Sequence, residues 1–172
     1  MFRVYIACLA AYNSGVMHGE WVEVTGDVDA LKEEIARILK ESPEEDAEEW
    51  AVHDHEGFGS YNVTEWPDLE ALCDHVAAYE ESSHDSDLID GVIADRNCTA
   101  REAIAIIDTD YQGEYDDLEC WAEQFLQDTG SVNLSRDLSY YFDYEKYGRD
   151  REMEGSIIAI PSGSKVHVLW NN

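Results

Sequence analysis

Residues 108–130, DTDYQGEYDDLECWAEQFLQDTG, combine an acidic segment with a clear helical pattern. Apolar side chains recur at i, i+3, i+4, i+7 and i+8, the spacing that places them on one face of an α-helix: Leu118, Trp121, Ala122, Phe125 and Leu126. Gly130 is suited to end this helix because glycine readily adopts positive φ. At the other end, Asp116 and Glu119 form an Asp-x-x-Glu cap for the free N–H groups. The stretch predicts an acidic loop that leads into a capped amphipathic helix.

The acidic part of this stretch also has the spacing of an EF-hand calcium loop. The residues at loop positions 1, 3, 6, 9 and 12 are Asp108, Asp110, Gly113, Asp116 and Glu119. Position 5 is Gln112 and position 8 is Tyr115, neither of which is usual in such a loop. The sequence contains no second loop of this kind. An EF-hand-like calcium-binding module is therefore an alternative rather than the main interpretation.

Towards the N-terminus, the pattern changes to strands around one helix. Apolar residues alternate over 2–8, and EWVEV (20–24) and WAVHDHE (50–56) are further extended segments. Between them, Asp27 is placed to cap a helix with apolar residues at helical spacing: Val28, Leu31, Ile35 and Leu39. This region predicts a small α/β domain with a short antiparallel sheet.

The middle of the chain is predicted to be helical. After Pro67, one apolar stripe consists of Leu69, Leu72, Val76 and Tyr79. SSHDSDL (82–88) is predicted to break the helical pattern, and Thr99 with Glu102 forms a capping box that opens a further short helix.

The C-terminal region is predicted to combine helix and strand. A helix is expected over about 137–147, with Gly148 as its end, followed by two β segments around the turn at 161–164. The aromatic residues near this helix are expected to serve in core and interface: Tyr140, Tyr141, Phe142, Tyr144 and Tyr147.

Net charge limits the possible partners. The chain has 39 acidic and 11 basic residues, a formal net charge of −28. Residues 41–95 contain 18 Asp and Glu and no Lys or Arg, and 102–135 contain 9 more without a cation, so 27 of 39 have no local counter-charge. Direct binding to nucleic acid or to an anionic membrane is excluded, since those surfaces need Lys and Arg. A basic partner is expected, and a salt-adapted acidic interaction protein is an alternative.

Other chemistry has little support in the sequence. The four cysteines form no CxxC pair, and His53 with His55 is expected to be a surface pair on one strand face rather than a metal site. There is no nucleophile elbow, phosphate-binding glycine motif or HExxH, so neither catalytic residues nor a cofactor are predicted. No signal segment or membrane span is recognisable, and a cytoplasmic location is expected.

Three blocks resemble, in the same order, the ArdA family of antirestriction proteins. They are RVYIACLAAYNSGVMHGEWVEV (3–24), YQGEYDDLECWAEQFLQDTG (111–130) and YYFDYEKYGRD (140–150). The resemblance implies a homodimeric DNA mimic, not an enzyme, that occupies the DNA-binding groove of type I restriction-modification enzymes and protects incoming mobile DNA. It also implies an α+β fold, an elongated chain of three small domains: N-terminal α/β (1–62), helical middle (63–103) and C-terminal α/β (104–172).

The resemblance also assigns residues to roles. An antirestriction motif at 111–130, near the dimer interface, would include Tyr111, Gly113, Glu114, Tyr115, Leu118, Trp121 and Phe125. The carboxylates expected to stand in for phosphates are Glu41, Glu44, Glu45, Asp46, Glu48, Glu49, Asp68, Glu70, Asp85, Asp87, Asp90, Asp116 and Asp117. They would meet Arg and Lys in the groove of the enzyme's methyltransferase core.

Overall fold

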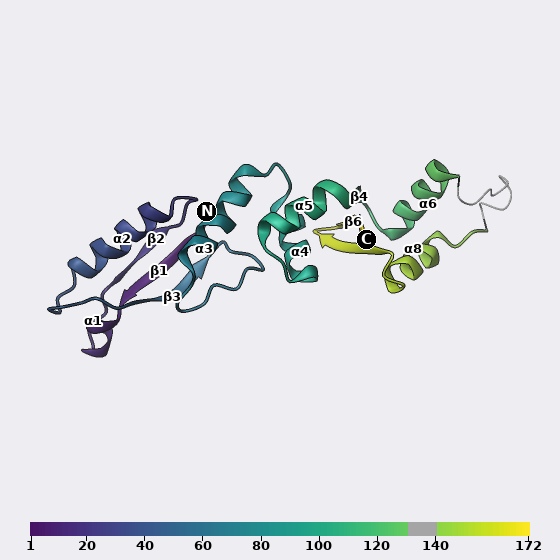
Figure 1. The fold of residues 1–172 in the computed structure, drawn as a ribbon. Coiled ribbons are helices and arrows are strands. Elements are labelled where there is room, and N and C mark those ends of the chain that lie inside the picture. Colours follow the sequence, from purple (N-terminus) through teal and green to yellow (C-terminus); the bar gives the residue numbers. More distant parts are fainter. Residues whose placement is uncertain (131–140) are drawn as a thin grey trace. The chain divides into compact units, whose positions relative to one another are not determined.

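The computed structural model describes residues 1–130 and 141–172, and the described chain has an α+β fold. Contacts divide it into two compact units, Met1–Ser83 with Thr99–Arg101, and His84–Cys98 with Glu102–Asn172. Each unit contains one antiparallel three-stranded sheet (Figure 1). The predicted fold class is confirmed. The division into three domains stays a prediction. The predicted middle domain, 63–103, is divided between the two units, with 63–83 and 99–101 in the first and the rest in the second.

The sheet of the first unit has the strand order β2-β1-β3. Its strands are β1 (Arg3–Cys8), β2 (Gly19–Glu23) and β3 (Trp50–Glu56), as the alternation of apolar residues predicts. In the antiparallel register, Val4 pairs with Val22 and Ile6 with Val52, and all four side chains are buried. A single apolar face of this sheet therefore forms half of the unit's core.

Two capped helices complete this core. In α2 (Val28–Lys40), the Asp27 side chain accepts hydrogen bonds from the backbone N–H groups of Asp29 and Ala30, as predicted. In α3 (Leu69–Glu81), Asp68 caps the helix in the same way. The buried residues that the two helices add to the core are Leu31, Ile35, Ile38, Leu72, Cys73 and Val76. The short helix α1 (Leu9–Asn13), which the sequence did not predict, follows β1 directly.

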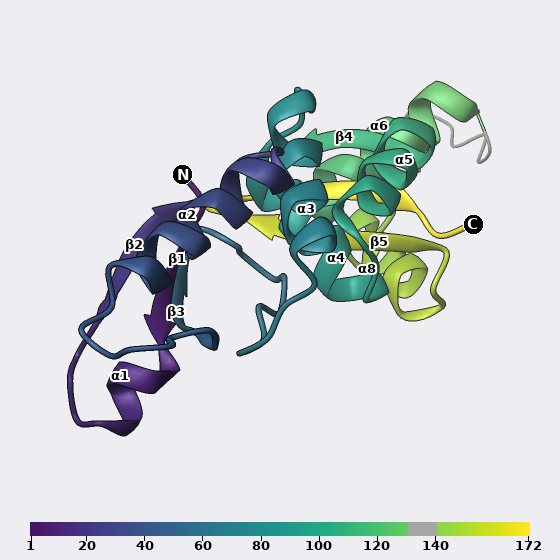
Figure 2. The same ribbon diagram turned by 60° about the vertical axis from the view of Figure 1, so that its left-hand side comes forward.

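The sheet of the second unit has the order β4-β6-β5, with β4 (Tyr111–Tyr115), β5 (Ile157–Ser162) and β6 (Lys165–Trp170). On one face, Val166, Val168 and Trp170 of β6 pack with the buried Trp121. This face is covered by α6 (Leu118–Thr129) and α8 (Tyr144–Met153). His167 stands between Val166 and Val168 in β6, so it belongs to the opposite face of the sheet. Its side chain is only 2% exposed, so that face is covered too (Figure 2).

Helices α4 (Ser86–Arg96) and α5 (Ala100–Asp110) lie before this sheet in the chain. Gly91 of α4 lies directly against Ile160 of β5, and an added Cβ would stand 2.1 Å from the Ile160 Cγ2 atom. The capping box at Thr99 correctly predicts where α5 begins. The 82–88 stretch ends α3 as predicted, and the next helix, α4, begins inside it at Ser86.

Two predictions in the C-terminal region are wrong. Residues 111–115 are strand β4 rather than a loop, because they pair with β6. The second error concerns Gly148, which lies inside α8 and does not end it. A Cβ at Gly148 would stand 2.6 Å from the Leu118 carbonyl oxygen, so this glycine allows α8 to approach α6 closely. The predicted start of that helix, and Tyr140, lie outside the described residues.

Candidate functional site

The predicted acidic residues lie at the surface of both units. Glu44 and Asp90 are half-buried, and the other eleven are exposed. Six of them lie on the segment 41–49 between α2 and β3, and Asp90 lies in the second turn of α4. The other six lie in the first turn of α3 or α4, or just before α3, α4 or α6. Carboxylates near helix N-termini are stabilised by the helix dipole, which allows a high density of negative charge at these places.

The cations of the chain are largely used within the fold. Eight of the ten Lys and Arg residues in the described ranges form ion pairs with carboxylates. Arg37 alone contacts three, at 2.7 Å to Glu20, 2.9 Å to Glu34 and 3.1 Å to Glu41. Its hydrogen bond holds the pKa of Glu20 below the usual value. Exposed pairs of this kind add little stability, but they leave few cations to neutralise the remaining carboxylates.

Arg101 is a second cation with more than one partner. Its guanidinium lies 2.6 Å from Asp74 and 3.0 Å from Glu81, and the hydrogen bond to Asp74 is the first cause of its raised pKa. Arg101 therefore neutralises two carboxylates of α3 that are not among the predicted mimic residues. Within the described part of the chain, the segment 41–49 forms an ion pair only at Glu41, its first residue.

Two of the predicted surface carboxylates also cap helices. Asp68 accepts hydrogen bonds at the start of α3, and Asp117 Oδ1 accepts one from the Cys120 backbone N–H at 2.8 Å. This backbone hydrogen bond lowers the pKa of Asp117. The prediction that Asp116 caps α6 is wrong by one residue, because the helix begins at Leu118 and Asp117 is its N-cap.

The motif region is built on an irregular strand. The register of β4 on β6 shifts between Tyr111 and Gly113, which leaves Gln112 in a bulge. Gly113 has φ +141°, and a Cβ there would stand 3.2 Å from the Tyr115 hydroxyl. The Tyr115 ring thus folds back over its own strand, and its hydroxyl donates to the Gln112 carbonyl at 3.1 Å.

Two contacts from β6 hold the remainder of β4. Lys165 Nζ donates to Glu114 at 2.6 Å, and this hydrogen bond lowers the pKa of Glu114. On the same strand, the Tyr111 hydroxyl lies 2.8 Å from Nδ1 of the buried His167. Tyr111 and Glu114 are therefore tied to the sheet.

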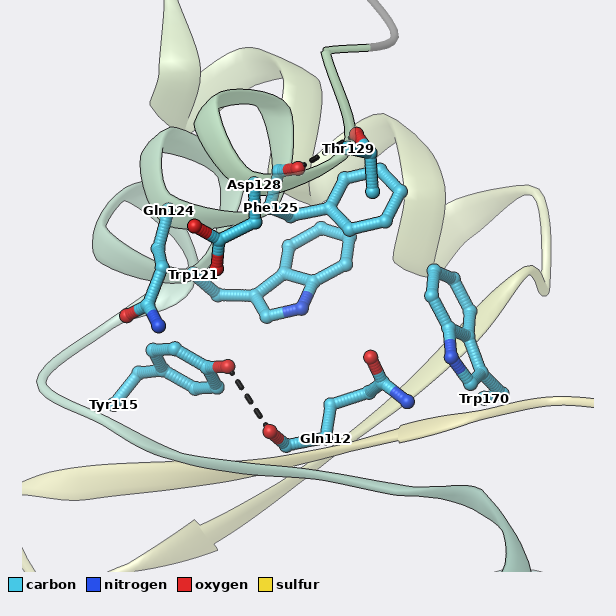
Figure 3. Close-up of a pocket in the computed structure, with 8 residues that line it drawn as sticks. All are labelled: Gln112, Tyr115, Trp121, Gln124, Phe125, Asp128, Thr129 and Trp170. Atoms are coloured by element: carbon cyan, nitrogen blue, oxygen red, sulfur yellow. Dashed lines mark hydrogen bonds between the residues drawn. The ribbon is translucent and has the colours of Figure 1, made fainter.

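Aromatic side chains of the motif region surround a hollow of about 370 Å³, shown in Figure 3. Trp121 and Phe125 stack with ring centroids 5.3 Å apart and an angle of 9° between planes. Trp170 meets Phe125 edge-on at 5.3 Å. We call this site the aromatic hollow, and its lining residues are Gln112, Tyr115, Trp121, Gln124, Phe125, Asp128, Thr129 and Trp170.

The structure thus brings three predicted motif residues, Tyr115, Trp121 and Phe125, to one site. Leu118 packs in the same core, while Tyr111, Gly113 and Glu114 belong to the strand beside it. Sequence reasoning missed Trp170, which lies far along the chain. The alternation in KVHVLW would place it on the same face as Val166 and Val168, which is the signal that was available.

The dimer assignment of this region stays a prediction. Trp121 is 1% exposed and packs inside its own unit, so its first role is in the core. Tyr141 is 82% exposed, whereas Phe142 packs against Tyr144 and Tyr147.

The geometry does not fit an EF-hand. Asp108 and Asp110 are in the last turn of α5, and the next five residues form β4, so the expected ligand loop does not exist. His53 packs against Tyr12 and His55 against Phe58. Within 1–130 and 141–172, no three His, Cys, Asp or Glu side chains gather in a way that would hold a metal ion.

The described helices include none with the length and apolarity needed to cross a lipid bilayer. No curated protein matches the sequence. The family described as "Antirestriction protein (ArdA)" matches residues 4–166 of the 172. Because this match covers both units and nearly the whole chain, the protein belongs to the ArdA family of antirestriction proteins.

Proposed function

We propose that this antirestriction protein is a DNA mimic that competes for the DNA-binding groove of a type I restriction-modification enzyme. The observation that carries the proposal is the imbalance of surface charge. Eleven of the thirteen predicted carboxylates are exposed, and most cations of the described chain are already paired within the fold. The surface therefore offers a basic groove many carboxylates with little competing positive charge.

The net charge of the chain is comparable to the phosphate charge of a short DNA duplex. Duplex DNA carries one negative charge per ~1.7 Å of its axis, so 28 charges correspond to roughly 48 Å of duplex. Lys and Arg that normally bind phosphates would bind these carboxylates instead, with release of counterions from both surfaces. Such a mimic carries no base sequence, so it would inhibit enzymes with different recognition sites.

The remaining features of the proposal follow from the same surface and from the family. The target is the methyltransferase core, whose groove binds DNA, and the protein acts as a homodimer through the region 111–130. It inhibits by occupancy rather than by catalysis, acts in the cytoplasm, and protects mobile DNA on entry. Direct binding to nucleic acid is opposed by the charge of −28.

The test is displacement of a labelled DNA duplex from a purified type I methyltransferase core by the folded protein, at two salt concentrations. We expect displacement at low salt that weakens steeply as salt rises, because the contacts are between exposed charges. Failure to displace DNA at low salt by a properly folded protein would reject the DNA-mimic mechanism.

A further inference from the structure

A hollow of the first unit lies at the end of the acidic segment 41–49. Its volume is about 440 Å³, and its lining residues are Leu9, Glu48, Glu49, Trp50 and Trp66. We call it the tryptophan hollow. All its lining residues belong to Met1–Ser83, and none belongs to the region 111–130, to which the homodimer contact is assigned. It is therefore a candidate contact for the enzyme rather than for a second copy of this chain.

Backbone hydrogen bonds hold the lining of this hollow. The Leu9 N–H donates to the Glu49 carbonyl at 3.0 Å, which joins the end of the acidic segment to the start of α1. The Val52 N–H donates to the Glu65 carbonyl at 2.9 Å, which holds the residue before Trp66 against β3. The hollow is thus built on the sheet, and a preformed site costs less entropy to fill.

Trp66 is the most exposed apolar side chain of the lining. It is 64% exposed, whereas Trp50 is half-buried and packs against the core of its unit. Tryptophan is enriched among the residues that dominate protein interfaces, because one side chain brings a large apolar area and an aromatic face. Two tryptophans and a leucine around one hollow therefore offer a surface that a partner would cover.

The carboxylates of Glu48 and Glu49 limit the chemistry of the group that covers it. Both residues are exposed, and the lining includes neither Lys nor Arg. An uncharged apolar group would remove water from the carboxylates without replacing its hydrogen bonds, which is costly. A cation is instead attracted by the carboxylates and by the faces of the tryptophan rings.

Among cations, arginine fits this lining best. Its guanidinium stacks on aromatic faces and can donate two parallel hydrogen bonds to one carboxylate. The ammonium group of lysine is compact and strongly hydrated, so it loses more when it leaves water. A quaternary ammonium group has no N–H to donate to Glu48 or Glu49.

We propose that the tryptophan hollow receives an arginine side chain from the basic groove of the enzyme that this chain inhibits. The guanidinium contacts the exposed Trp66 ring and donates to the carboxylate of Glu48 or Glu49. This contact adds one fixed anchor to the diffuse attraction of the segment 41–49. Because the partner covers it, salt screens it less than the exposed charges. The proposal rests on the proposed function for the partner, but the binding of arginine can be measured without that partner.

The first experiment titrates the full chain with Nα-acetyl-arginine amide at a constant ionic strength near ~0.15 M, where the Debye length is about 8 Å. NMR follows the indole N–H signals of all five tryptophans. We expect the Trp66 signal to shift most and Trp50 to shift less, while Trp21, Trp121 and Trp170 remain. The neutral citrulline analogue should cause no such shift, and the lysine analogue should bind more weakly. No shift at Trp66, or equal shifts with citrulline, would overturn the proposal.

Two double variants of the same segment separate the hollow from the general negative charge. Glu48→Gln with Glu49→Gln removes the carboxylates that line it, and Glu44→Gln with Glu45→Gln removes two that do not. Both variants carry −28 + 2 = −26. We expect the first to weaken arginine binding about tenfold, as for loss of a charged hydrogen bond, and the second to change it less than about twofold. Equal weakening would assign the binding to general charge and overturn the proposal.

Variants of Trp66 then test the anchor in the DNA-displacement assay. We expect Trp66→Ala to weaken displacement about tenfold, the size of a cation–aromatic contact that is shielded from water. Trp66→Phe should retain more inhibition than Trp66→Leu, because only phenylalanine keeps an aromatic face. Met17→Ala changes a side chain that is 78% exposed in the same unit and does not line the hollow, and its effect should be less than about twofold. Equal losses for the two alanine variants, or equal inhibition by the Phe and Leu variants, would overturn the anchor.

The salt dependence distinguishes the anchor from the exposed charges. Relative to wild type, the loss with Trp66→Ala should persist at the higher salt concentration, whereas the loss from neutralised carboxylates should shrink. A Trp66→Ala loss that vanishes as salt rises would contradict the proposal. If the wild-type protein displaces no DNA, the proposed function fails, and the arginine titration alone decides whether the tryptophan hollow binds a guanidinium.

Discussion

Gly148 in α8 lies against the Leu118 carbonyl of α6, so closely that a Cβ would stand 2.6 Å from this oxygen and 2.9 Å from the Leu118 Cβ. We predict that Gly148→Ala destabilises the protein by about 1–3 kcal/mol, because overpacking at the helix crossing exceeds the ~1 kcal/mol gain in helix propensity. Urea unfolding followed by circular dichroism measures the change. Glu152→Ala, an exposed substitution on the same helix, should change stability by less than about 0.5 kcal/mol. A stabilised Gly148→Ala protein would show that the helices do not approach as described.

The sequence predicted the elements whose signals are local. Asp27 and the apolar spacing after it lie within one helix, and α2 was predicted correctly. In contrast, β4 is a strand because YQGEY pairs with β6, more than fifty residues later, and no pattern within five residues shows that. The alternation in KVHVLW indicates which face of β6 Trp170 occupies, but its contact with Phe125 depends on the pairing of the sheet, which no local pattern shows.

Gly148 and α4 show a second reason why local sequence patterns do not predict the whole structure. Glycine near a helical pattern usually predicts the helix end, but here its lack of a side chain serves packing between α6 and α8. Helix α4 begins among Ser and Asp residues, which predict a break as readily as a helix start. In both cases the tertiary contact decides between two local interpretations.

The segment 41–49 provides the sharpest test of charge mimicry. We predict that replacing five of its carboxylates by the corresponding amides weakens DNA displacement about tenfold at low salt. The five residues are Glu44, Glu45, Asp46, Glu48 and Glu49. This estimate takes about 0.3 kcal/mol for each exposed charge. Each single substitution should change inhibition less than about twofold. Asp46→Asn should be tolerated structurally, since Asp46 has φ 58° and asparagine accepts that conformation.

A matched control removes the same charge elsewhere. Five exposed carboxylates outside the predicted set are Glu23, Glu33, Glu65, Glu80 and Glu123. Both variants carry −28 + 5 = −23. If both lose the same inhibition, total charge rather than this segment determines binding. If one single substitution in 44–49 abolishes inhibition in a folded protein, a discrete site replaces the distributed one.

The cap of α6 gives a pH-dependent prediction. Asp117→Ala should cost about 1 kcal/mol of stability near neutral pH, and Asp116→Ala, which removes the same charge, much less. The folded-state pKa of Asp117 is lowered, so its charged form stabilises the fold above the unfolded-state pKa, ~3.9. This contribution disappears as pH falls through the folded-state pKa. Thermal unfolding from pH 7 downwards should therefore show the wild-type advantage over Asp117→Ala shrinking in acid. Equal losses for the two alanine variants would contradict the assignment of the cap.

Arg37 and Lys40 lie in the last turn of α2, yet only Arg37 joins three carboxylates. We predict that Arg37→Gln lowers the thermal midpoint at low salt more than Lys40→Gln, because it leaves Glu20, Glu34 and Glu41 to repel one another. The difference should nearly vanish near ~1 M salt, where the Debye length is about 3 Å. Equal midpoints at low salt would mean that these exposed pairs contribute nothing. At a temperature where both variants are folded, Arg37→Gln should displace DNA at least as well as wild type, because it removes a cation next to the segment 41–49. Weaker displacement by the folded variant would count against simple charge mimicry.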